Sequence, residues 1–266
     1  GMFDSGVGGL SVLRAIHKLL PAQPVIYFAD QGHVPYGQRT LQEVCGFAEG
    51  ITRFLLAEGA VLIVVACNTA SAAALHHLRR TFPAVPFVGM EPAVKPAAEQ
   101  TLSGVVGVLA TPATFQGALY ASVVERFANS VTLLQDTCDG LVQRIEAGEL
   151  ELPETRAILE KALTPMLRQG IDTVVLGCTH YPFAIPLIQE IAGDSVRVID
   201  PAPAVARQAQ RLLEAANLAA AGDHSGELRI ITTGDPQALE RLLPRLIETR
   251  QSVERAAWQG EQLSLI

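Results

Sequence analysis

Two cysteines stand where a reactive thiol would be useful in an α/β protein. Cys67 follows the apolar run Val61–Ala66, Cys178 follows the apolar run Thr173–Gly177, and a helical pattern comes after each cysteine. A thiol is a weak acid that acts as a base or a nucleophile once it has ionised. Two such thiols on opposite sides of one small molecule would take a proton from one face of a tetrahedral carbon and return a proton to the other face. That chemistry inverts a stereocentre.

Each thiol would need a helper, because a free thiol is only a few per cent ionised at pH 7. Asp4 ends the first strand, in Phe3–Asp4, and is the candidate helper in the half that carries Cys67. His180 comes two residues after Cys178 and is the candidate helper in the other half. Taken alone, an aspartate at a strand end would equally well cap a helix, and a single histidine is more often structural. Their pairing with the cysteines favours catalytic roles for both.

The cysteines do not form a disulfide or zinc pattern. They stand at positions 45, 67, 138 and 178, with no CxxC pair and no histidine at zinc-ligand spacing. Structural disulfides are rare in cytosolic proteins. A cysteine-based redox protein would have a close pair, whereas Cys67 and Cys178 stand 111 positions apart. We therefore predict no metal site and no redox pair.

The elements that must position these residues follow from the hydrophobic pattern, which alternates between short apolar runs and longer amphipathic stretches. Near-continuous Val, Ile and Leu content is typical of parallel strands that are buried on both faces. Their alternation with helical patterns indicates an α/β fold with parallel sheets. The predicted strands are Val25–Ala29, Val61–Ala66, Val85–Gly89, Val105–Leu109, Val131–Gln135, Thr173–Gly177, Val196–Ile199 and Leu228–Thr232. The predicted helices include Gly9–Leu20, Thr40–Glu58, Ala70–Thr81, Pro153–Gln169 and Ala202–Ala216.

The order of these elements repeats along the chain. The matched segments are Val61–Cys67 with Asp172–Cys178 and Val85–Val88 with Val196–Ile199, both at an offset of 111, and Val25–Phe28 with Val131–Leu134, at an offset of 106. We infer two similar α/β domains related by internal duplication, each with one cysteine at the same place, and an active site in the cleft between them. Open α/β sheets bind ligands beyond the carboxyl ends of their strands, which is where both thiols would lie.

The duplication predicts the domain boundaries. We expect a first domain of residues 1–90 with residues 205–266, and a second domain of residues 91–204. The segment after about residue 205 adds helices and one more strand, Leu228–Thr232, and it has no counterpart before the repeat. We therefore expect it to pack back on the first half.

The glycine-rich segment Asp4–Gly9 does not match a nucleotide-binding loop. It lacks the GxGxxG spacing and the Gly-Lys-Ser/Thr ending of a P-loop. Its glycines would instead let backbone N–H groups approach a small carboxylate, and Val34–Gly37 is a second turn of this kind. A pyridoxal cofactor needs a Schiff-base lysine, but Lys18, Lys95 and Lys161 all lie on helical or surface-like stretches. We therefore expect no cofactor.

The composition is that of a compact folded chain. Of the 266 residues, 49% are hydrophobic and 18% are charged, which excludes a disordered protein, and the formal net charge is −7. The negative charge and the lack of a basic run argue against nucleic acid as the main partner. The apolar runs are far shorter than the ~20 residues that span a bilayer, and no signal-peptide pattern is present. We expect a cytoplasmic protein without a membrane partner.

Four motifs resemble those of the glutamate racemase family, in order over about residues 3 to 205. They are Phe3–Leu10, Val34–Gly37, Ala66–Ala70 and Leu176–Pro182. The resemblance implies an enzyme that interconverts L- and D-glutamate without a cofactor or a metal and that supplies D-glutamate for bacterial peptidoglycan. It places the catalytic cysteines on Cys67 and Cys178, the assisting residues on Asp4, His180 and Glu146, and the substrate contacts on Asp4, Ser5, Tyr36, Gly37, Asn68, Thr69, Thr179 and His180.

The chain departs from the family pattern at two places. Cys138–Leu141 stands where the family usually has a Cys-Pro-Leu-Phe-like stretch, and this departure weakens the assignment of Glu146. His33 precedes Val34–Gly37 where an arginine is common, which would change the rim of the cleft.

Two other functions stay open at the level of sequence. The substrate could be aspartate or another amino acid, because pocket length is not readable from the motifs. A non-catalytic carboxylate-binding protein would keep the loops, although it would have no use for matched thiols. A small-molecule substrate, glutamate, is the expected partner, and the oligomeric state is left open, with a homodimer as one option.

Overall fold

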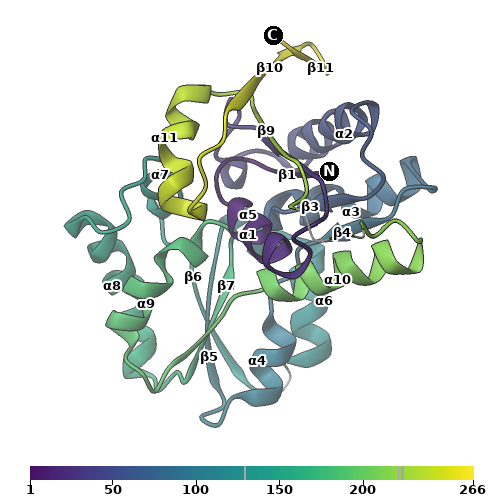
Figure 1. The fold of residues 1–266 in the computed structure, drawn as a ribbon. Coiled ribbons are helices and arrows are strands. Elements are labelled where there is room, and N and C mark those ends of the chain that lie inside the picture. Colours follow the sequence, from purple (N-terminus) through teal and green to yellow (C-terminus); the bar gives the residue numbers. More distant parts are fainter. Residues whose placement is uncertain (129, 221, 223–224) are drawn as a thin grey trace.

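The computed structural model describes residues 1–128, 130–220, 222 and 225–266, which form two sheets with helices on their faces (Figure 1). Within these residues the first sheet has seven strands in the order β11-β10-β9-β2-β1-β3-β4. Its neighbouring strands are parallel except for the antiparallel pair β10 and β11. Its strands are β1 (Met2–Asp4), β2 (Val25–Ala29), β3 (Ile63–Val65), β4 (Phe87–Gly89), β9 (Leu228–Thr232), β10 (Val253–Gln259) and β11 (Gln262–Leu265).

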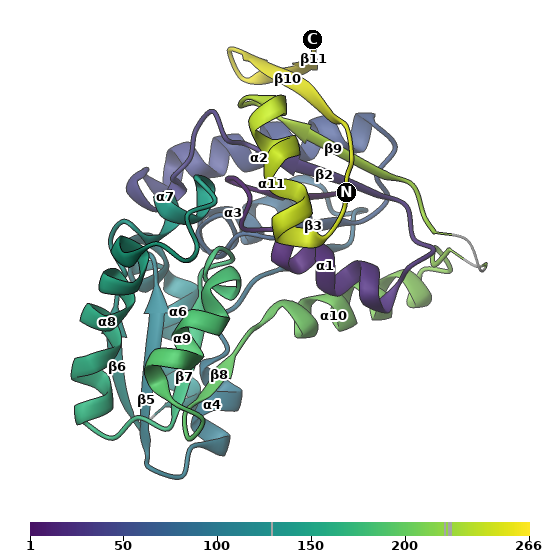
Figure 2. The ribbon, with the colours of Figure 1, turned by 60° about the vertical axis from the view of Figure 1, so that its left-hand side comes forward.

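The second sheet is wholly parallel, and over the same described ranges it has four strands in the order β6-β5-β7-β8. Figure 2 shows it below the first sheet. Every residue of β7 is buried, which agrees with its uninterrupted apolar run between two helical layers. The strands are β5 (Val105–Ala110), β6 (Thr132–Asp136), β7 (Thr173–Gly177) and β8 (Arg197–Ile199). The predicted α/β class with parallel sheets is confirmed.

Helices cover both faces of each sheet. On the first sheet, α1 and α10 share one core cluster, whereas α2 and α3 belong to a second cluster on the other face. On the second sheet, α8 and α9 pack on one face and α4 and α6 on the other. The helices are α1 (Leu10–Leu19), α2 (Leu41–Ala57), α3 (Asn68–Thr81), α4 (Val94–Gln100), α5 (Pro112–Gln116), α6 (Ala118–Phe127), α7 (Leu141–Glu146), α8 (Pro153–Arg168), α9 (Ile185–Ala192), α10 (Ala202–Ala215) and α11 (Pro236–Ile247), with short 3₁₀ turns η1 (Tyr36–Gln38) and η2 (Tyr181–Ala184).

Local sequence explains where the longest of these helices begins. The hydroxyl of Thr40 accepts a hydrogen bond from the backbone N–H of Glu43, and the Glu43 carboxylate accepts one from the backbone N–H of Thr40. This capping box satisfies donors that the first turn of a helix leaves free. It fixes the start of α2 one residue after Thr40, close to the predicted start.

The internal duplication is visible in the strand order. Strands β2-β1-β3-β4 recur as β6-β5-β7-β8. Phe3 of β1 lies opposite Val65 of β3, and Leu109 of β5 lies opposite Leu176 of β7. Val65 and Leu176 are 111 positions apart, as predicted for β3 and β7. Phe3 and Leu109 therefore correspond, which makes β1 and β5 equivalent at an offset of 106. The two halves therefore repeat one four-stranded α/β unit, as predicted.

One detail of the predicted repeat is wrong. Phe3 lies opposite Phe28, whereas the equivalent Leu109 lies opposite Asp136, so β2 and β6 correspond at an offset of 108 rather than 106. Side chains alternate across a strand with a period of two. A slip of two residues therefore keeps every apolar side chain on its own face, which is why the sequence pattern alone did not reveal it.

The segment after residue 205 packs on the first half, as expected, but it contributes more than the one predicted strand. β9 pairs with β2, and β10 and β11 extend the sheet beyond it. β10 and β11 were missed because their polar residues break the apolar run that marked the other strands. We propose the predicted domain boundaries, residues 1–90 with 205–266 and residues 91–204, because the two sheets draw their strands from these ranges.

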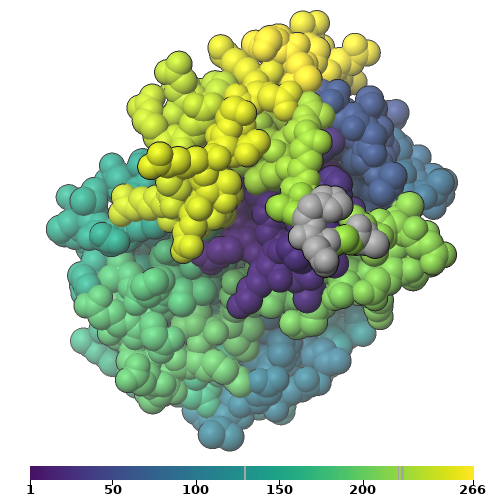
Figure 3. Space-filling model, in the orientation of Figure 1, coloured from purple at the N-terminus to yellow at the C-terminus, as the bar shows by residue number. Residues whose placement is uncertain are grey.

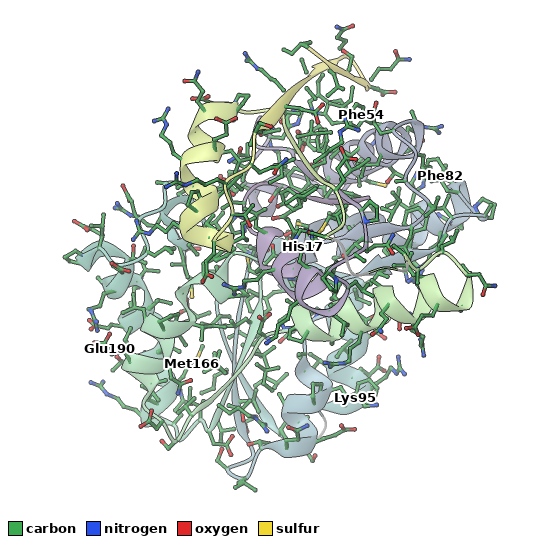
Figure 4. The ribbon with its side chains drawn as sticks, in the orientation of Figure 1. His17, Phe54, Phe82, Lys95, Met166 and Glu190 are labelled. Atoms are coloured by element: carbon green, nitrogen blue, oxygen red, sulfur yellow. The ribbon has the colours of Figure 1, made fainter. Side chains whose placement is uncertain are left out.

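The two halves share packing at their junction. One core cluster contains Leu10 and Leu13 of α1 together with Leu176 and Tyr181 of the second half. In Figure 4, Phe54 lies in the upper half and Met166 in the lower half, and each belongs to its own cluster. Figure 3 shows the C-terminal segment above the N-terminal segment on one face. In the described part of the chain, no helix is both long and apolar enough to span a membrane.

Candidate active site

The carboxyl ends of strands from both sheets meet at one pocket. Asp4 ends β1, Cys67 follows β3, Thr111 follows β5 and Cys178 follows β7. Ligands of open α/β sheets bind beyond such strand ends. The cavity between these strand ends is narrow, with a volume of about 20 Å³. Its lining residues are Ser5, Pro35, Tyr36, Gly37, Cys67, Asn68, Thr69, Thr111, Thr114, Val142, Gly177, Cys178, Thr179 and His180. The site predicted between the halves is thus a real pocket with both cysteines in its wall.

Cys67 sits at the amino end of α3 and contacts Asp4. Its Sγ accepts a hydrogen bond from the backbone N–H of Ala70 at 3.4 Å, so the thiol also caps the helix. The thiol is buried and hydrogen-bonds to the Asp4 carboxyl group. Burial raises the pKa of Cys67 well above its usual value, and the nearby charge of Asp4 raises it further. Cys67 is therefore held as a protonated thiol.

Asp4 stands behind Cys67 rather than in the pocket wall. Its side chain is fully buried, and Oδ2 accepts a hydrogen bond from Gly9 N at 2.6 Å. Burial raises the pKa of Asp4 above its ordinary value, and the positive charge of His180 and the hydrogen bond from Cys67 oppose this rise. Asp4 therefore receives the backbone N–H that precedes α1 and is also the carboxyl group that contacts Cys67.

On the other side of the pocket, Cys178, His180 and Glu146 form a chain. Cys178 Sγ lies 3.7 Å from His180 Nδ1, and His180 Nε2 lies 2.6 Å from Glu146 Oε1. Burial alone would lower the pKa of His180, but the hydrogen bonds to Cys178 and Glu146 outweigh it and raise this pKa well above 6.5. Burial would likewise raise the pKa of Glu146, and the hydrogen bond and charge of His180 outweigh it and lower the pKa. The pair is therefore an imidazolium and a carboxylate.

Glu146 reaches this position through the glycines of the first half. Its Oε1 accepts a hydrogen bond from Val7 N at 2.8 Å. A Cβ on Gly6 would lie 1.9 Å from the Glu146 carboxylate, and a Cβ on Gly8 would lie 2.4 Å from the His180 ring. The glycine loop does bring a backbone N–H to a carboxylate, as expected, but that carboxylate belongs to the protein. The geometry supports the assignment of Glu146 that the departing motif had weakened.

Asn68 is the unusual residue of the pocket wall. Within the described residues, both its amide nitrogen and its amide oxygen are buried and have no hydrogen-bond partner. Leaving buried polar groups unpaired is costly, so such groups point to a missing ligand. The amide offers a donor for a carboxylate and an acceptor for an ammonium group. An amino acid bears both.

Among the described residues that line the pocket, none is a Lys or an Arg. The polar groups of the wall include the hydroxyl and amide side chains of Ser5, Asn68, Thr69 and Thr179, which the sequence predicts in the site, together with the His180 ring. No group of three or more His, Cys, Asp or Glu side chains in a metal-binding arrangement occurs among the described residues.

The model of the Asp/Glu/hydantoin racemase family matches residues 7–209. The chain belongs to this family. A glutamate racemase of Roseiflexus sp. (strain RS-1) is 51% identical over 257 residues, which are 96% of this chain and 94% of that protein. The glutamate racemase isoform RacE1 of Bacillus anthracis has a TM-score of 0.85 at 29% identity, with 98% of this chain and 97% of that chain covered. The Escherichia coli glutamate racemase in complex with L-glutamate and activator UDP-MurNAc-Ala has a TM-score of 0.85 at 33% identity, with 97% and 98% covered. The resemblance to glutamate racemases is confirmed.

Most of the predicted site residues of this racemase family member lie together in the pocket wall. The predicted residues in the pocket wall are Ser5, Tyr36, Gly37, Cys67, Asn68, Thr69, Cys178, Thr179 and His180. Asp4 and Glu146 lie one layer behind, where each contacts a residue of the wall. His33 is not among the lining residues, and its ring stacks on Phe47 with centroids 4.0 Å apart.

Thr111, Thr114 and Val142 were missed from the sequence. Thr111 Oγ1 lies 3.1 Å from Thr69 Oγ1 and 3.0 Å from Thr114 Oγ1, so the wall has a hydroxyl cluster. The equivalence of β1 and β5 at an offset of 106 places Thr111 at the position of Ser5. The internal repeat could therefore have predicted Thr111 as a site residue, but only once the register of β1 against β3 was known.

We expect Glu146→Gln to lower the pKa of His180 in this racemase family member. Without the carboxylate, the hydrogen bond to Cys178 alone opposes the effect of burial, so the His180 imidazole should titrate at a lower pH than in the wild type. The measurement is an NMR titration of the histidine rings, with the His180 signals assigned from a His180→Asn variant. A wild-type His180 that titrates near 6.5 would contradict the imidazolium assignment.

The same pair has a predictable effect on stability. A raised His180 pKa stabilises the fold fully below pH 6.5, and this contribution is lost as pH rises through the folded-state pKa. A lowered Glu146 pKa stabilises the fold above pH 4.5, and this contribution is lost as pH falls. The free energy of unfolding should therefore differ most between wild type and Glu146→Gln from about pH 4.5 to 6.5. A difference that grows above this range would exclude the ion pair.

Proposed function

We propose that this chain interconverts L-glutamate and D-glutamate by proton transfer at Cα between Cys67 and Cys178, without a cofactor. The observation that carries the proposal is the placement of both thiols in one pocket, at equivalent strand ends of the two halves, each with its own acid–base partner. Both thiols line the same narrow pocket, which supports their action on one substrate atom. The similarity to glutamate racemases supports glutamate as the substrate.

In one direction Cys178 acts as the base. The His180 ring lies 3.7 Å from Cys178 Sγ, and its contact with Glu146 holds it where its positive charge faces the sulfur atom. The Cys178 thiolate takes the Cα proton, and the electron pair of the broken C–H bond moves toward the α-carboxylate. The Cys67 thiol gives its proton to the opposite face of Cα. The products are the other enantiomer, a neutral Cys178 thiol and a Cys67 thiolate.

The reverse direction exchanges the two roles. Cys67 must then lose its proton, and Asp4 is the hydrogen-bonded group that would receive it. A raised pKa makes the Asp4 carboxylate a stronger base than an ordinary aspartate. The two thiols thus have different helpers, a carboxyl group for Cys67 and an imidazolium for Cys178.

Two alternatives are distinguished by specific features of the pocket. A carboxylate-binding protein would need the donors of Asn68 and Thr179 but would have no use for a Cys178–His180–Glu146 chain. An aspartate racemase would share the thiols, and only substrate length would separate the two activities. The proposed metabolic role, supply of D-glutamate for peptidoglycan synthesis in the cytoplasm, follows from the glutamate activity and suits a chain whose described cysteines are all free thiols.

The deciding experiment follows exchange of the Cα hydrogen in deuterated water by NMR. We expect exchange and inversion with both enantiomers of glutamate, unchanged by a metal chelator and without an added cofactor, and no exchange with aspartate. Exchange with aspartate but not with glutamate would establish the aspartate alternative. Binding of glutamate without any exchange would establish the carboxylate-binding alternative.

A further inference from the structure

A buried carboxylate outside the pocket wall links three distant segments of the chain. Asp30 follows β2, has no exposed surface and takes part in no step of the proposed reaction. Its Oδ2 accepts a hydrogen bond from the Tyr36 hydroxyl at 2.6 Å and lies 2.9 Å from His33 Nδ1. Its Oδ1 accepts hydrogen bonds from the Thr233 hydroxyl at 2.8 Å and from the indole N–H of Trp258 at 2.9 Å. Four side chains thus converge on one carboxyl group.

The four contacts keep this carboxyl group ionised. Burial would raise the pKa of Asp30, but the hydrogen bonds from His33, Trp258 and Tyr36 outweigh it and lower the pKa. Hydrogen bonds to a charged acceptor are stronger than those between neutral groups. The hydrogen bond to Asp30 therefore restrains the position of Tyr36, which lies in the pocket wall.

The turn that Asp30 holds is the one that delivers Tyr36 and Gly37 to the pocket. Tyr36 is buried and begins the short η1 turn. A Cβ on Gly37 would lie 3.0 Å from Cβ of Thr111, so this turn of the first half closes directly on the second half. A small displacement of Tyr36 would therefore change the shape of the pocket.

Trp258 brings the C-terminal hairpin, strands β10 and β11, into the same network. Its ring lies 5.8 Å from Phe47 and 5.6 Å from His33, measured between centroids. It also packs on α2 at Gly50, where a Cβ would lie 2.7 Å from the indole ring. Figures 1 and 2 show this hairpin at the edge of the first sheet, far along the chain from the β2 segment.

We infer that Asp30 is a positioning residue that holds the Tyr36–Gly37 turn in its substrate-contacting position, and that the C-terminal hairpin acts on the pocket through Trp258 and Asp30. The inference rests on the proposed function of this pocket. It assigns a role to a segment that lies beyond residue 209, where the match to the family model ends.

The first test uses two glycines one turn apart in α2. Gly46 is exposed and a Cβ there would meet nothing within 4 Å, whereas a Cβ on Gly50 would displace the Trp258 ring. Both substitutions to alanine raise helix propensity alike. We expect Gly50→Ala to raise KM for glutamate about two- to tenfold, the range of one weakened hydrogen bond, with kcat within about twofold of wild type. Gly46→Ala should keep both constants. Equal constants in the two variants would overturn the role of Trp258.

The second test asks whether Asp30 acts through Tyr36. Asp30→Asn and Tyr36→Phe should each raise KM more than they lower kcat, and the double variant should be little worse than either single variant. Non-additivity of this kind is expected only if the two side chains act as one unit. Fully additive effects, or a loss of kcat that follows thermal unfolding, would show that Asp30 merely supports the fold.

A third measurement does not depend on turnover. Trp258 is the one tryptophan of the chain, so its fluorescence reports on the hairpin alone. We expect both Asp30→Asn and Tyr36→Phe to shift its emission maximum, because Tyr36 and Trp258 both donate hydrogen bonds to the Asp30 carboxylate. Gly46→Ala should leave the emission maximum unchanged. Unshifted emission in both variants would overturn the inference. A wild-type protein that does not racemise glutamate would instead refute the proposed function, and the fluorescence would then decide on Asp30 by itself.

Discussion

Cys67→Ser and Cys178→Ser are each expected to abolish racemisation while the fold is retained. A serine hydroxyl nearly matches the thiol in shape, but it is far too weak an acid to serve as the base at neutral pH. The fold should survive at Cys67 in particular, because this residue is the N-cap of α3 and serine is a favoured N-cap residue. The measurements are turnover in both directions and thermal unfolding. Turnover above about a tenth of the wild-type value, a loss of less than ~1.4 kcal/mol in the barrier, would remove that cysteine from the mechanism.

The two variants also differ in a way that a structural defect would not produce. A chain with a single thiol can still remove a Cα proton and return one to the same face. Cys67→Ser should therefore exchange the Cα hydrogen of one enantiomer without inversion, and Cys178→Ser that of the other. The matched control is Cys45→Ser, because Cys45 lies half-buried on α2 and is not among the pocket-lining residues. Exchange of both enantiomers by either cysteine variant would contradict the two-base proposal.

The positions of the two thiols could be predicted from the sequence because they depend on a general rule. A buried apolar run predicts a parallel strand, and the residue after such a strand lies at the ligand-binding edge of the sheet. Cys67 and Cys178 satisfy that rule twice, at one offset. The resemblance to glutamate racemases assigned the neighbouring residues Asn68 and Thr179 to the site, and both line the pocket. The location of the thiols was predictable because it is determined within a few residues of chain.

The supporting residues were harder to predict because tertiary contacts position them. Glu146 ends a six-residue helix and reaches His180 only because Gly6 leaves room for its carboxylate. Asp30 looks like an ordinary residue after a strand, and its partner Trp258 lies 228 positions further along the chain. No local pattern encodes a hydrogen bond of that separation. The strands β10 and β11 were missed for a related reason, since pairing rather than hydrophobicity defines them.

Asn68→Ala is expected to reduce kcat by about 10²–10³, the usual loss when one preorganised donor for a developing anion is removed. Removal of the Cα proton moves negative charge onto the α-carboxylate. The amide N–H of Asn68 is buried in the pocket wall with no protein partner among the described residues, so it is available for that charge. No Lys or Arg of the described pocket lining could replace it. The fall should appear in kcat and not only in KM.

The same variant should leave the free energy of unfolding unchanged or slightly higher, because no protein group loses a partner when the amide is removed. Ser71→Ala in the same helix is the matched control with the opposite expectation. Its hydroxyl donates to Val65 O and accepts from Met90 N, so this variant should lose stability and keep kcat. Weaker glutamate binding with an unchanged kcat in Asn68→Ala would mean that the amide binds ground state and transition state equally, and Asn68 would then be a substrate anchor without a part in the chemical step.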